Sequence, residues 1–420
     1  MVETKMPGPA TDTAAIAVDV LIVGAGPVGG ALGVALAGAG LKVALVDRAD
    51  PQLLTDDAFD GRASAIALGT GRVLKGIGVW DRLTTAEPIL DIRVTDSDAP
   101  VFLHYDHRAA AAPGEPPAPF GHIVENTDLR RAIWARARSL PNLEIFAPAD
   151  ILSLDRGRDV AIARMKDGRE VRAALAVSAE GRASRLRSEA GIGVTEWRYP
   201  QVGIVCTVRH ARPHGGVAHE HFLPSGPFAS LPMSGNRSSI VWTERADLAP
   251  AALKLDDDEF SAELQRRFGN WLGEVRVEGG RWSYPLGLMH AERYVDGRLA
   301  LVGDAAHLIH PIAGQGLNLG LRDVAALAET VVDARRLGLD IGSLQVLDRY
   351  QRWRRVDNLT LIAVTDGLNR LFSTSFAPIA VARRLGIMAV QNLPPLKRLF
   401  MRHAMGLVGE LPRLVAGRAL

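Results

Sequence analysis

The pattern of hydrophobic and polar positions along the chain begins with two short apolar runs, one on either side of a stretch of small residues. Residues 19–23 form an apolar run of the length expected for a buried strand, and residues 41–46 form a second one. Between them, residues 28–39 are mostly glycine, alanine, leucine and valine, which favours a closely packed helix. This succession predicts a strand, a tight turn, a helix and a second strand, which is a βαβ unit.

Further along, continuous runs give way to alternation and to helical spacing. Residues 92–105 alternate, and residues 109–119, rich in alanine and proline, predict a loop between two strands. A helix is predicted over residues 126–139, a strand over 144–149, and a hairpin over 160–165 and 171–177, with its turn at Lys166, Asp167 and Gly168.

Four strand-like pieces then predict an antiparallel sheet, and the rest of the chain is mostly helical. The strand-like pieces are residues 203–209, 218–222, 229–232 and 238–243. Helical spacing runs from residue 317 to the end, with interruptions near Pro378 and at Pro394 and Pro395. We find no internal repeat.

Composition narrows the class of protein. The 420 residues are 47% hydrophobic and 23% charged, as in globular proteins, and the length allows two or three packed units. Cys206 is the only cysteine, which excludes a disulfide within the chain and suits the cytoplasm. A net charge of +2 does not indicate nucleic-acid binding. Residues 20–41 lack charge, but their seven glycines and Pro27 argue against a membrane span. We expect residues 1–17 to be a flexible N-terminus without an export signal.

The first chemical signal is the string GAGPVG at residues 24–29. Gly24 permits the turn, Gly26 lets the backbone approach a pyrophosphate, and Gly29 lets the helix pack against the strand. Asp47, at the end of the second strand, is placed to accept a hydrogen bond from a ribose hydroxyl. The order of strand, turn, helix, strand and acid favours dinucleotide binding over a simple packing turn. This string does not distinguish NAD from FAD.

The second signal makes that distinction. A strand-like run at residues 298–302 is followed by GDAAHLIHPIAGQGLNLGL. This string resembles the second flavin-binding motif of class A flavoprotein monooxygenases, which have the para-hydroxybenzoate hydroxylase fold. The resemblance implies that Asp304 holds the ribityl chain of FAD and that a helix beginning at Gly316, Leu317 and Asn318 points at the pyrimidine end of the flavin. Without it, the string is an acidic helix cap followed by a glycine loop. The flavin-facing candidates are Pro311, Gly314 and Gln315.

Four more strings extend the resemblance to class A flavoprotein monooxygenases, and the last three of them resemble the ubiquinone-biosynthesis ring hydroxylases in particular. Residues 179–187 are similar to the family's middle motif, but Glu180 stands where the family usually has aspartate. The strings DGRASAIALG and GHIVENTDLR, at residues 60–69 and 121–130, imply that Arg62 and Asn126 lie near the flavin. Surface solvation or helix capping is the alternative for these two residues. The run TDGLNRLF at residues 365–372 adds a C-terminal signature, so that the resemblance covers nearly the whole chain after residue 18.

The family resemblance and the strand pattern together imply an α/β fold with a discontinuous Rossmann-type FAD-binding domain, an antiparallel-sheet substrate domain and a C-terminal helical segment. We expect the FAD-binding domain to comprise residues 18–80, 122–186 and 283–345. The substrate domain would then comprise residues 81–121 and 187–282, and the C-terminal helical region residues 346–420.

The implied activity is hydroxylation of the aromatic ring of a polyprenylated phenol intermediate of ubiquinone biosynthesis, through a flavin C4a-hydroperoxide. The expected cofactors are FAD, NADPH or NADH as the electron donor, and molecular oxygen as the co-substrate. No catalytic base is assigned and no metal site is expected, since the eleven histidines lack metal-ligand spacing. Two interpretations stay open for His221, Phe222, Pro224 and Leu231 to Met233. They would line the cavity for the substrate, or they would belong to the hydrophobic core.

Two alternatives remain open from the sequence. Another flavoenzyme, such as a halogenase or a prenyl reductase, would share the fold, although no W-x-W-x-I-P string is present. A non-catalytic flavin-containing accessory protein would also share it.

The basic and apolar tail, residues 380–420, predicts peripheral contact with the inner face of the cell membrane or with a complex that carries the lipid substrate. A helical cap or a face of a homo-oligomer is the alternative for this tail.

Overall fold

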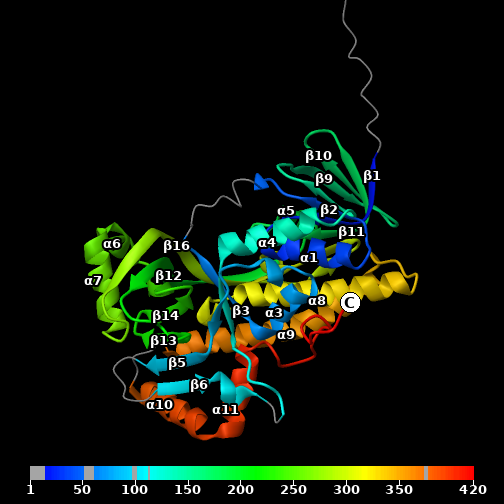
Figure 1. Cartoon of the computed structure of the whole chain (residues 1–420). Helices are drawn as coiled ribbons and strands as arrows, with labels where there is room; N and C mark the ends of the chain where they lie inside the picture. Colours follow the sequence, from blue (N-terminus) through cyan, green and yellow to red (C-terminus); the bar gives the residue numbers. More distant parts are fainter. Residues whose placement is uncertain (1–14, 52–60, 97–101, 112–113, 373–376) are drawn as a thin grey trace, which may run out of the picture.

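The computed structural model describes residues 15–51, 61–96, 102–111, 114–372 and 377–420. Most of the segment expected to form the flexible N-terminus, residues 1–17, lies outside them. The long helices α8 (Gly316–Arg336) and α9 (Leu344–Phe372) cross the middle of the molecule, with the first of two large sheets above them and the β5 and β6 end of the second sheet below (Figure 1).

The predicted βαβ unit is confirmed at the centre of the first sheet. It consists of β1 (Ile16–Val23), α1 (Pro27–Gly38) and β2 (Val43–Val46), and the two strands are parallel. The strand order is β17-β18-β11-β1-β2-β8, with β9 and β10 attached to β11. The remaining strands are β8 (Leu143–Phe146), β9 (Ile151–Arg156), β10 (Ala161–Met165), β11 (Glu170–Ser178), β17 (Val295–Asp296) and β18 (Leu299–Leu301). The expected hairpin is β10 and β11, and β9 extends it by a third strand that the sequence did not predict.

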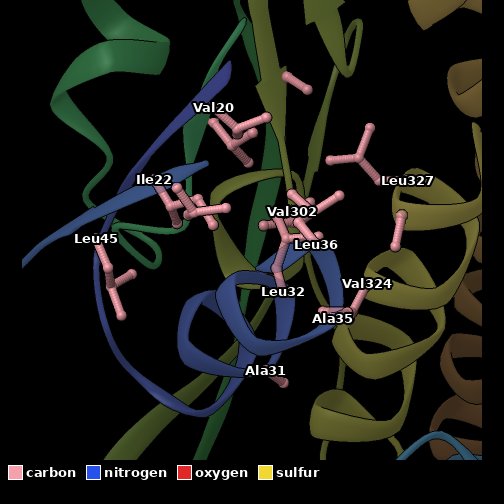
Figure 2. Close-up of a cluster of buried hydrophobic side chains, with 14 of the residues drawn as sticks. Val20, Ile22, Ala31, Leu32, Ala35, Leu36, Leu45, Val302, Val324 and Leu327 are labelled. Atoms are coloured by element: carbon pink, nitrogen blue, oxygen red, sulfur yellow. The ribbon is translucent and has the colours of Figure 1, made fainter. Parts of the chain in front are cut away.

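The core of this domain lies where α1 is enclosed by the sheet and α8. Figure 2 shows Leu32 and Leu36 of α1 near Val302, while Ala35 is directed at Val324 of α8. Small residues make this approach possible, because a Cβ atom at Gly320 of α8 would lie 2.6 Å from the side chain of Val28 on α1. The uncharged stretch of residues 20–41 is therefore a strand and a packed helix. Within the described ranges, no helix combines the length and the apolar character that crossing a membrane requires.

The second sheet is the predicted antiparallel one, with the order β19-β16-β12-β15-β14-β13-β5-β6. Its strands are β5 (Asp91–Asp96), β6 (Phe102–Asp106), β12 (Val194–His210), β13 (Val217–Leu223), β14 (Gly226–Met233), β15 (Arg237–Arg245), β16 (Val275–Ala291) and β19 (His307–Leu308). All its pairs are antiparallel except β13 and β5, which run parallel. Because β5 precedes the FAD-domain helix α4 (Asn126–Arg138), this parallel pair joins two chain segments that are distant in sequence.

Shorter elements complete the two domains. A three-stranded sheet connects them, formed by β3 (Ala63–Ala67), β7 (Gly121–Glu125) and β4 (Glu87–Ile89). The short helices are α3 (Leu68–Gly76), α5 (Arg185–Glu189), α6 (Ala249–Lys254) and α7 (Asp257–Phe268), with 3₁₀ turns at Trp80–Arg82, His107–Ala110, Gly303–Ala305 and Ile312–Gly314. Helix α7 covers one face of the second sheet and encloses a separate apolar cluster there.

The C-terminal region is helical and is tied to both domains. Helices α10 (Ala377–Asn392) and α11 (Pro394–Ala404) follow α9. Arg383 of α10 is buried and forms an ion pair of 2.7 Å with the buried Asp96 of β5. Past α11, Leu414 and Val415 enter the core of the FAD-binding domain. The tail is therefore partly a cap over the flavin domain, as one of the two interpretations of the sequence proposed.

The domain limits expected from the sequence stay a prediction, but the structure shows in which elements two of them fall. The cut between residues 282 and 283 falls inside β16, whose strand partners belong to the second sheet. The cut between residues 345 and 346 falls in the first turn of α9.

Candidate active site

A cavity of about 720 Å³ lies between the two sheets and is lined by residues of every predicted motif except the C-terminal run at residues 365–372. Of the predicted site residues, it is lined by Gly24, Gly26, Asp47, Asn126, Glu180, Asp304, Pro311, Gly314, Gly316 and Leu317. Four others, Gly29, Arg62, Gln315 and Asn318, are not in the lining. Its volume is in the range of cofactor sites, so that the motifs form one site although they lie as many as 293 residues apart, from Gly24 to Leu317.

The three glycines of the glycine-rich turn serve the different purposes that a pyrophosphate site requires. Gly24 has φ +103°, and a Cβ atom there would lie 2.4 Å from the carbonyl oxygen of Ala179. A Cβ atom at Gly29 would lie 1.9 Å from the carbonyl oxygen of Gly24, so Gly29 serves packing behind the cavity. At Gly26, by contrast, a Cβ atom would meet nothing within 4 Å. Gly26 therefore leaves open space at the N-terminus of α1, where unpaired N–H groups favour an anion.

Asp47 is directed back to this turn. One carboxylate oxygen accepts a hydrogen bond from Ala25 N–H at 2.5 Å, and the other accepts one from Ala49 N–H at 2.8 Å. Both bonds fix the carboxylate at the cavity wall, and its contact to a ribose stays a prediction.

Asp304 is held in place by a buried ionic cluster. Asp304 is on the turn Gly303–Ala305 and is open to the cavity, but the protein around it desolvates its carboxyl and raises its pKa. The fully buried Asp323 of α8 accepts from Gly303 N–H at 3.0 Å, from His307 Nε2 at 2.6 Å and from Arg354 Nε at 2.8 Å. Burial alone would raise the pKa of Asp323, but the His307 and Arg354 side chains outweigh it and lower it to about 2.

Helix α8 begins at the cavity and is fastened by Asn318. The Asn318 side chain is buried and accepts from Ala67 N–H at 2.8 Å, while its amide donates to the carbonyl oxygens of Ala65 and Gly314. These bonds occupy both ends of the amide, so the side chain positions the helix and only its backbone is available to a flavin. A Cβ atom at Gly316 would meet nothing within 4 Å, which leaves the helix N-terminus open to the cavity.

The middle motif is connected to the turn that carries Asp304. Glu180 accepts from Ser178 Oγ at 3.0 Å, from Ser184 Oγ at 2.8 Å and from Leu186 N–H at 3.0 Å. Arg187 is buried and donates to the carbonyl oxygens of Ala305 and Arg182. Desolvation lowers the pKa of Arg187. One buried guanidinium thus joins two motifs, and the sequence signalled it only as one of several basic residues after Glu180.

Of the three remaining predicted residues, Asn126 uses its side chain, while Arg62 and Gln315 accept hydrogen bonds through their carbonyl oxygens. Asn126, at the start of α4, accepts from Ser64 Oγ at 2.7 Å and lines the cavity. The exposed Arg62 accepts a hydrogen bond from Asn126 N–H through its carbonyl oxygen. Gln315 precedes α8, and its carbonyl oxygen accepts from Leu319 N–H.

The second sheet supplies the other wall of the cavity. It is formed there by Leu231, Val241 and residues 284–287, of which only Leu231 had been singled out from the sequence. His221 lines a separate cavity of about 140 Å³, on the α7 side of the sheet. Phe222 stacks on Phe372 in an apolar cluster, and Pro224 is exposed. Most of these sequence candidates therefore belong to the core or the surface.

This arrangement fits FAD and a planar aromatic compound. The open space at Gly26 and Gly316 leaves two helix N-termini accessible, and they suit a pyrophosphate and an electron-rich ring edge. Asp47 and Asp304 supply acceptors for hydroxyl groups between them. Leu231, Val241 and the β16 residues form a largely apolar wall at the other side.

Comparison with known proteins agrees with this site. The family model described as FAD binding domain matches residues 17–356. Ubiquinone hydroxylase UbiL of Rhodospirillum rubrum is 55% identical over 98% of this chain and 95% of its own. The 3-demethoxyubiquinol 3-hydroxylase of Escherichia coli is 35% identical over 93% of this chain and 98% of its own. Among solved structures, p-nitrophenol 4-monooxygenase PnpA of Pseudomonas putida covers 94% of this chain and 99% of its own, with a TM-score of 0.77 and 21% identity, and it shares the fold.

The predicted flavin motifs, their convergence on one cavity and these relatives lead to the same assignment. The chain is an oxidoreductase that uses FAD with a nicotinamide donor and molecular oxygen. It belongs to the FAD-binding-domain family of class A flavoprotein monooxygenases, in the branch of the ubiquinone-biosynthesis ring hydroxylases.

Proposed function

We propose that this protein hydroxylates the aromatic ring of a polyprenylated phenol intermediate of ubiquinone biosynthesis. The observation that carries the proposal is the single cavity in which the flavin motifs meet an apolar wall of the second sheet. Two relatives that are similar over nearly their whole length are named for ubiquinone or demethoxyubiquinol hydroxylation, which supports the substrate class.

Different residues of the cavity would hold different parts of FAD. The N-terminus of α1 at Gly26 would hold the pyrophosphate, Asp47 a ribose, and Asp304 the ribityl chain. The N-terminus of α8 would face the pyrimidine end, where its dipole favours the negative charge of the reduced ring. Bound FAD would supply the redox chemistry, taking electrons from the nicotinamide and delivering one atom of molecular oxygen to the ring.

The substrate side must place the ring and exclude water. Leu231, Val241 and Leu286 offer an apolar surface to an aromatic ring, and the cavity lies between two sheets rather than on the outside of one. Water exclusion protects the oxygen-transfer step, and orientation of the ring near the flavin replaces a bimolecular encounter.

The test is made in cells that lack the gene for this chain. Quinone intermediates are measured by mass spectrometry under oxygen after the intact chain, the Asp304→Ala variant or the Asp348→Ala variant is restored. Asp348, 44% exposed on α9, provides the matched control. We expect a phenolic prenylated intermediate to accumulate and only the intact chain and Asp348→Ala to remove it. An unchanged profile in cells without the gene would refute the quinone substrate.

We propose in addition that α10 and α11 hold the protein at an anionic lipid surface. Exposed apolar side chains lie on this pair of helices, or at Leu393 between them, next to exposed basic ones. The apolar ones are Leu385, Met388, Leu393, Leu399 and Phe400, and the basic ones are Arg384, Arg398 and Arg402. Each basic residue near an anionic bilayer contributes about 1 kcal/mol, which suits reversible binding. Arg383 does not contribute, because Asp96 holds it inside the protein.

Vesicle flotation of the full chain tests this surface. A chain that ends near Gly386 is unsuitable, because it lacks Leu414 and Val415 of the flavin-domain core. We expect binding to vesicles of phosphatidylglycerol but not of phosphatidylcholine, and loss of binding in the double variant Arg398→Glu and Arg402→Glu. A control reversal at the exposed Arg158 should have no effect. Equal flotation of the double variant and the control would contradict the proposal.

A further inference from the structure

Glu220 of β13 lies on the face of the second sheet that is turned to the flavin cavity. In the strand register, Glu220 is opposite Ala229 of β14, and Ala229 is opposite Val241 of β15. Directly opposite residues share one face of a sheet, so Glu220, Ala229 and Val241 point the same way. Val241 lines the cavity, as does Leu231, which follows Ala229 by two residues on the same face. Glu220 is therefore one strand beyond the cavity wall.

The neighbours of Glu220 on this face are mostly apolar, apart from Asp96 of β5, which lies opposite Phe222 and is paired with Arg383. The neighbour of Glu220 on the same face at one end, Ala218, belongs to an apolar cluster with Phe120 and Met233, and the neighbour at the other end, Phe222, belongs to a second one. Tyr105 of β6 packs against both clusters. The Glu220 side chain keeps some exposed surface although protein surrounds it, and this desolvation raises its pKa to about 7.

The carboxyl group of Glu220 also lacks a partner of its own. Across the described residues, no donor gives it a hydrogen bond and no cation forms an ion pair with it. The other buried acids differ, since Asp96 is paired with Arg383 and Asp323 with Arg354. An unpaired carboxyl in an apolar environment is costly, and such groups are found where a ligand provides the missing partner.

We propose that Glu220 accepts the hydroxyl hydrogen of the phenolic ring and thereby orients the ring at the flavin. The inference rests on the proposed function and names the residue that recognises the substrate class. Transfer of the hydrogen breaks the O–H bond of the phenol and forms one on the Glu220 carboxylate, with no change in oxidation state. The ring left as a phenolate is richer in electrons and reacts faster with an electrophilic oxygen. The proton returns when the product leaves.

Binding measurements without turnover provide the test. The FAD-loaded protein is titrated with a short-chain prenylated phenol and with its methyl ether, and the change in flavin absorbance gives each dissociation constant. The intact chain should bind the phenol roughly tenfold or more tightly than the ether, because only the phenol donates a hydrogen bond to the charged acceptor. In Glu220→Leu this preference should fall to about one.

Two further variants separate recognition from structure. Glu220→Gln retains an acceptor, so it should keep part of the preference for the phenol while turnover falls roughly a hundredfold for lack of a base. Removal of an unpaired buried carboxyl should also leave the fold as stable as before or more so. Glu196→Leu, at an exposed acid of β12, is the control and should change neither constant.

The outcomes are distinct. Preference for the phenol in Glu220→Leu equal to that of the intact chain would overturn the assignment, as would an intact chain that binds phenol and ether alike. If Glu220→Leu loses the preference while cells without the gene show no altered quinone intermediate, Glu220 stands as a phenol-binding residue and the proposed pathway is refuted.

Discussion

Asparagine at position 323 should destabilise the fold and loosen the turn that carries Asp304. Asp323 is fully buried, and its carboxylate accepts hydrogen bonds from Gly303 N–H, His307 Nε2 and Arg354 Nε. Asparagine has nearly the same size but carries no charge, and one end of its amide is a donor that would face other donors. Arg354, which is also fully buried, would keep only Asp357 and the amide oxygen of Asn358.

The magnitude follows from the loss of one partner in a buried pair. Such changes cost about 3 to 5 kcal/mol, because the remaining charge stays desolvated. The continued contact of Arg354 with Asp357 places the expected cost near the lower value, about 3 kcal/mol. This is a large part of the total stability of a typical domain, so that the change in the urea midpoint should be readily measured at an unchanged slope.

Asp366→Asn provides the matched control. Asp366 accepts from Tyr199 at 2.7 Å and pairs with Arg370, which is 68% exposed, so the loss should be below about 1 kcal/mol. Urea unfolding of the flavin-free protein measures both variants, and titration with FAD measures cofactor affinity. We expect only Asp323→Asn to weaken FAD binding. Equal, small losses in the two variants would refute the view that the buried cluster holds the turn.

Three more predictions concern the histidines and the glycine turn. Burial lowers the pKa of His290 and of His310 to about 4, so the stability they contribute is present above pH 6.5 and is lost as the pH falls towards 4. At pH 5, each histidine should lower the free energy of unfolding by about 2 kcal/mol relative to its value above pH 6.5. The urea midpoint should fall between these two pH values, and it should fall less in His310→Gln. Gly26→Ala should weaken FAD binding at least tenfold with little change in flavin-free stability, because its Cβ would enter the cavity. Gly29→Ala should instead fail to fold stably, since its Cβ would overlap the Gly24 carbonyl oxygen, and thermal melting distinguishes the two.

Local pattern was sufficient for some elements and insufficient for others. The βαβ unit at residues 16–46 was predictable because its strand, turn and helix each have their own signal in adjacent residues. The 17-residue strand β16 was not predicted, because it contains two adjacent glycines and Pro285 and its register with β12 shifts where bulges interrupt the alternation. The parallel pairing of β13 with β5 depends on residues more than a hundred positions apart and has no local signal.

Helix α9 illustrates a second reason. Its buried stripe includes Arg354, Asn358, Thr365 and Asn369, where helical periodicity would look for apolar residues. These side chains can be buried because residues of other elements form hydrogen bonds with them, such as Asp323 with Arg354 and Gln201 with Asn369. Burial of polar residues through distant partners cannot be inferred from the spacing of hydrophobic positions.

The motifs read from the sequence name the residues at the cavity, but the accuracy of the site depends on residues behind it. Asp304 is on a three-residue turn, which by itself would be a weak support for a contact to a cofactor. Two buried charges hold this turn from opposite ends, since Asp323 accepts from Gly303 N–H and Arg187 donates to the carbonyl oxygen of Ala305. Neither charge lines the cavity. Because both bonds use the backbone, the turn would keep its shape after a change of the Asp304 side chain, so that Asp304→Ala removes a contact to the cofactor without removing the geometry of the turn.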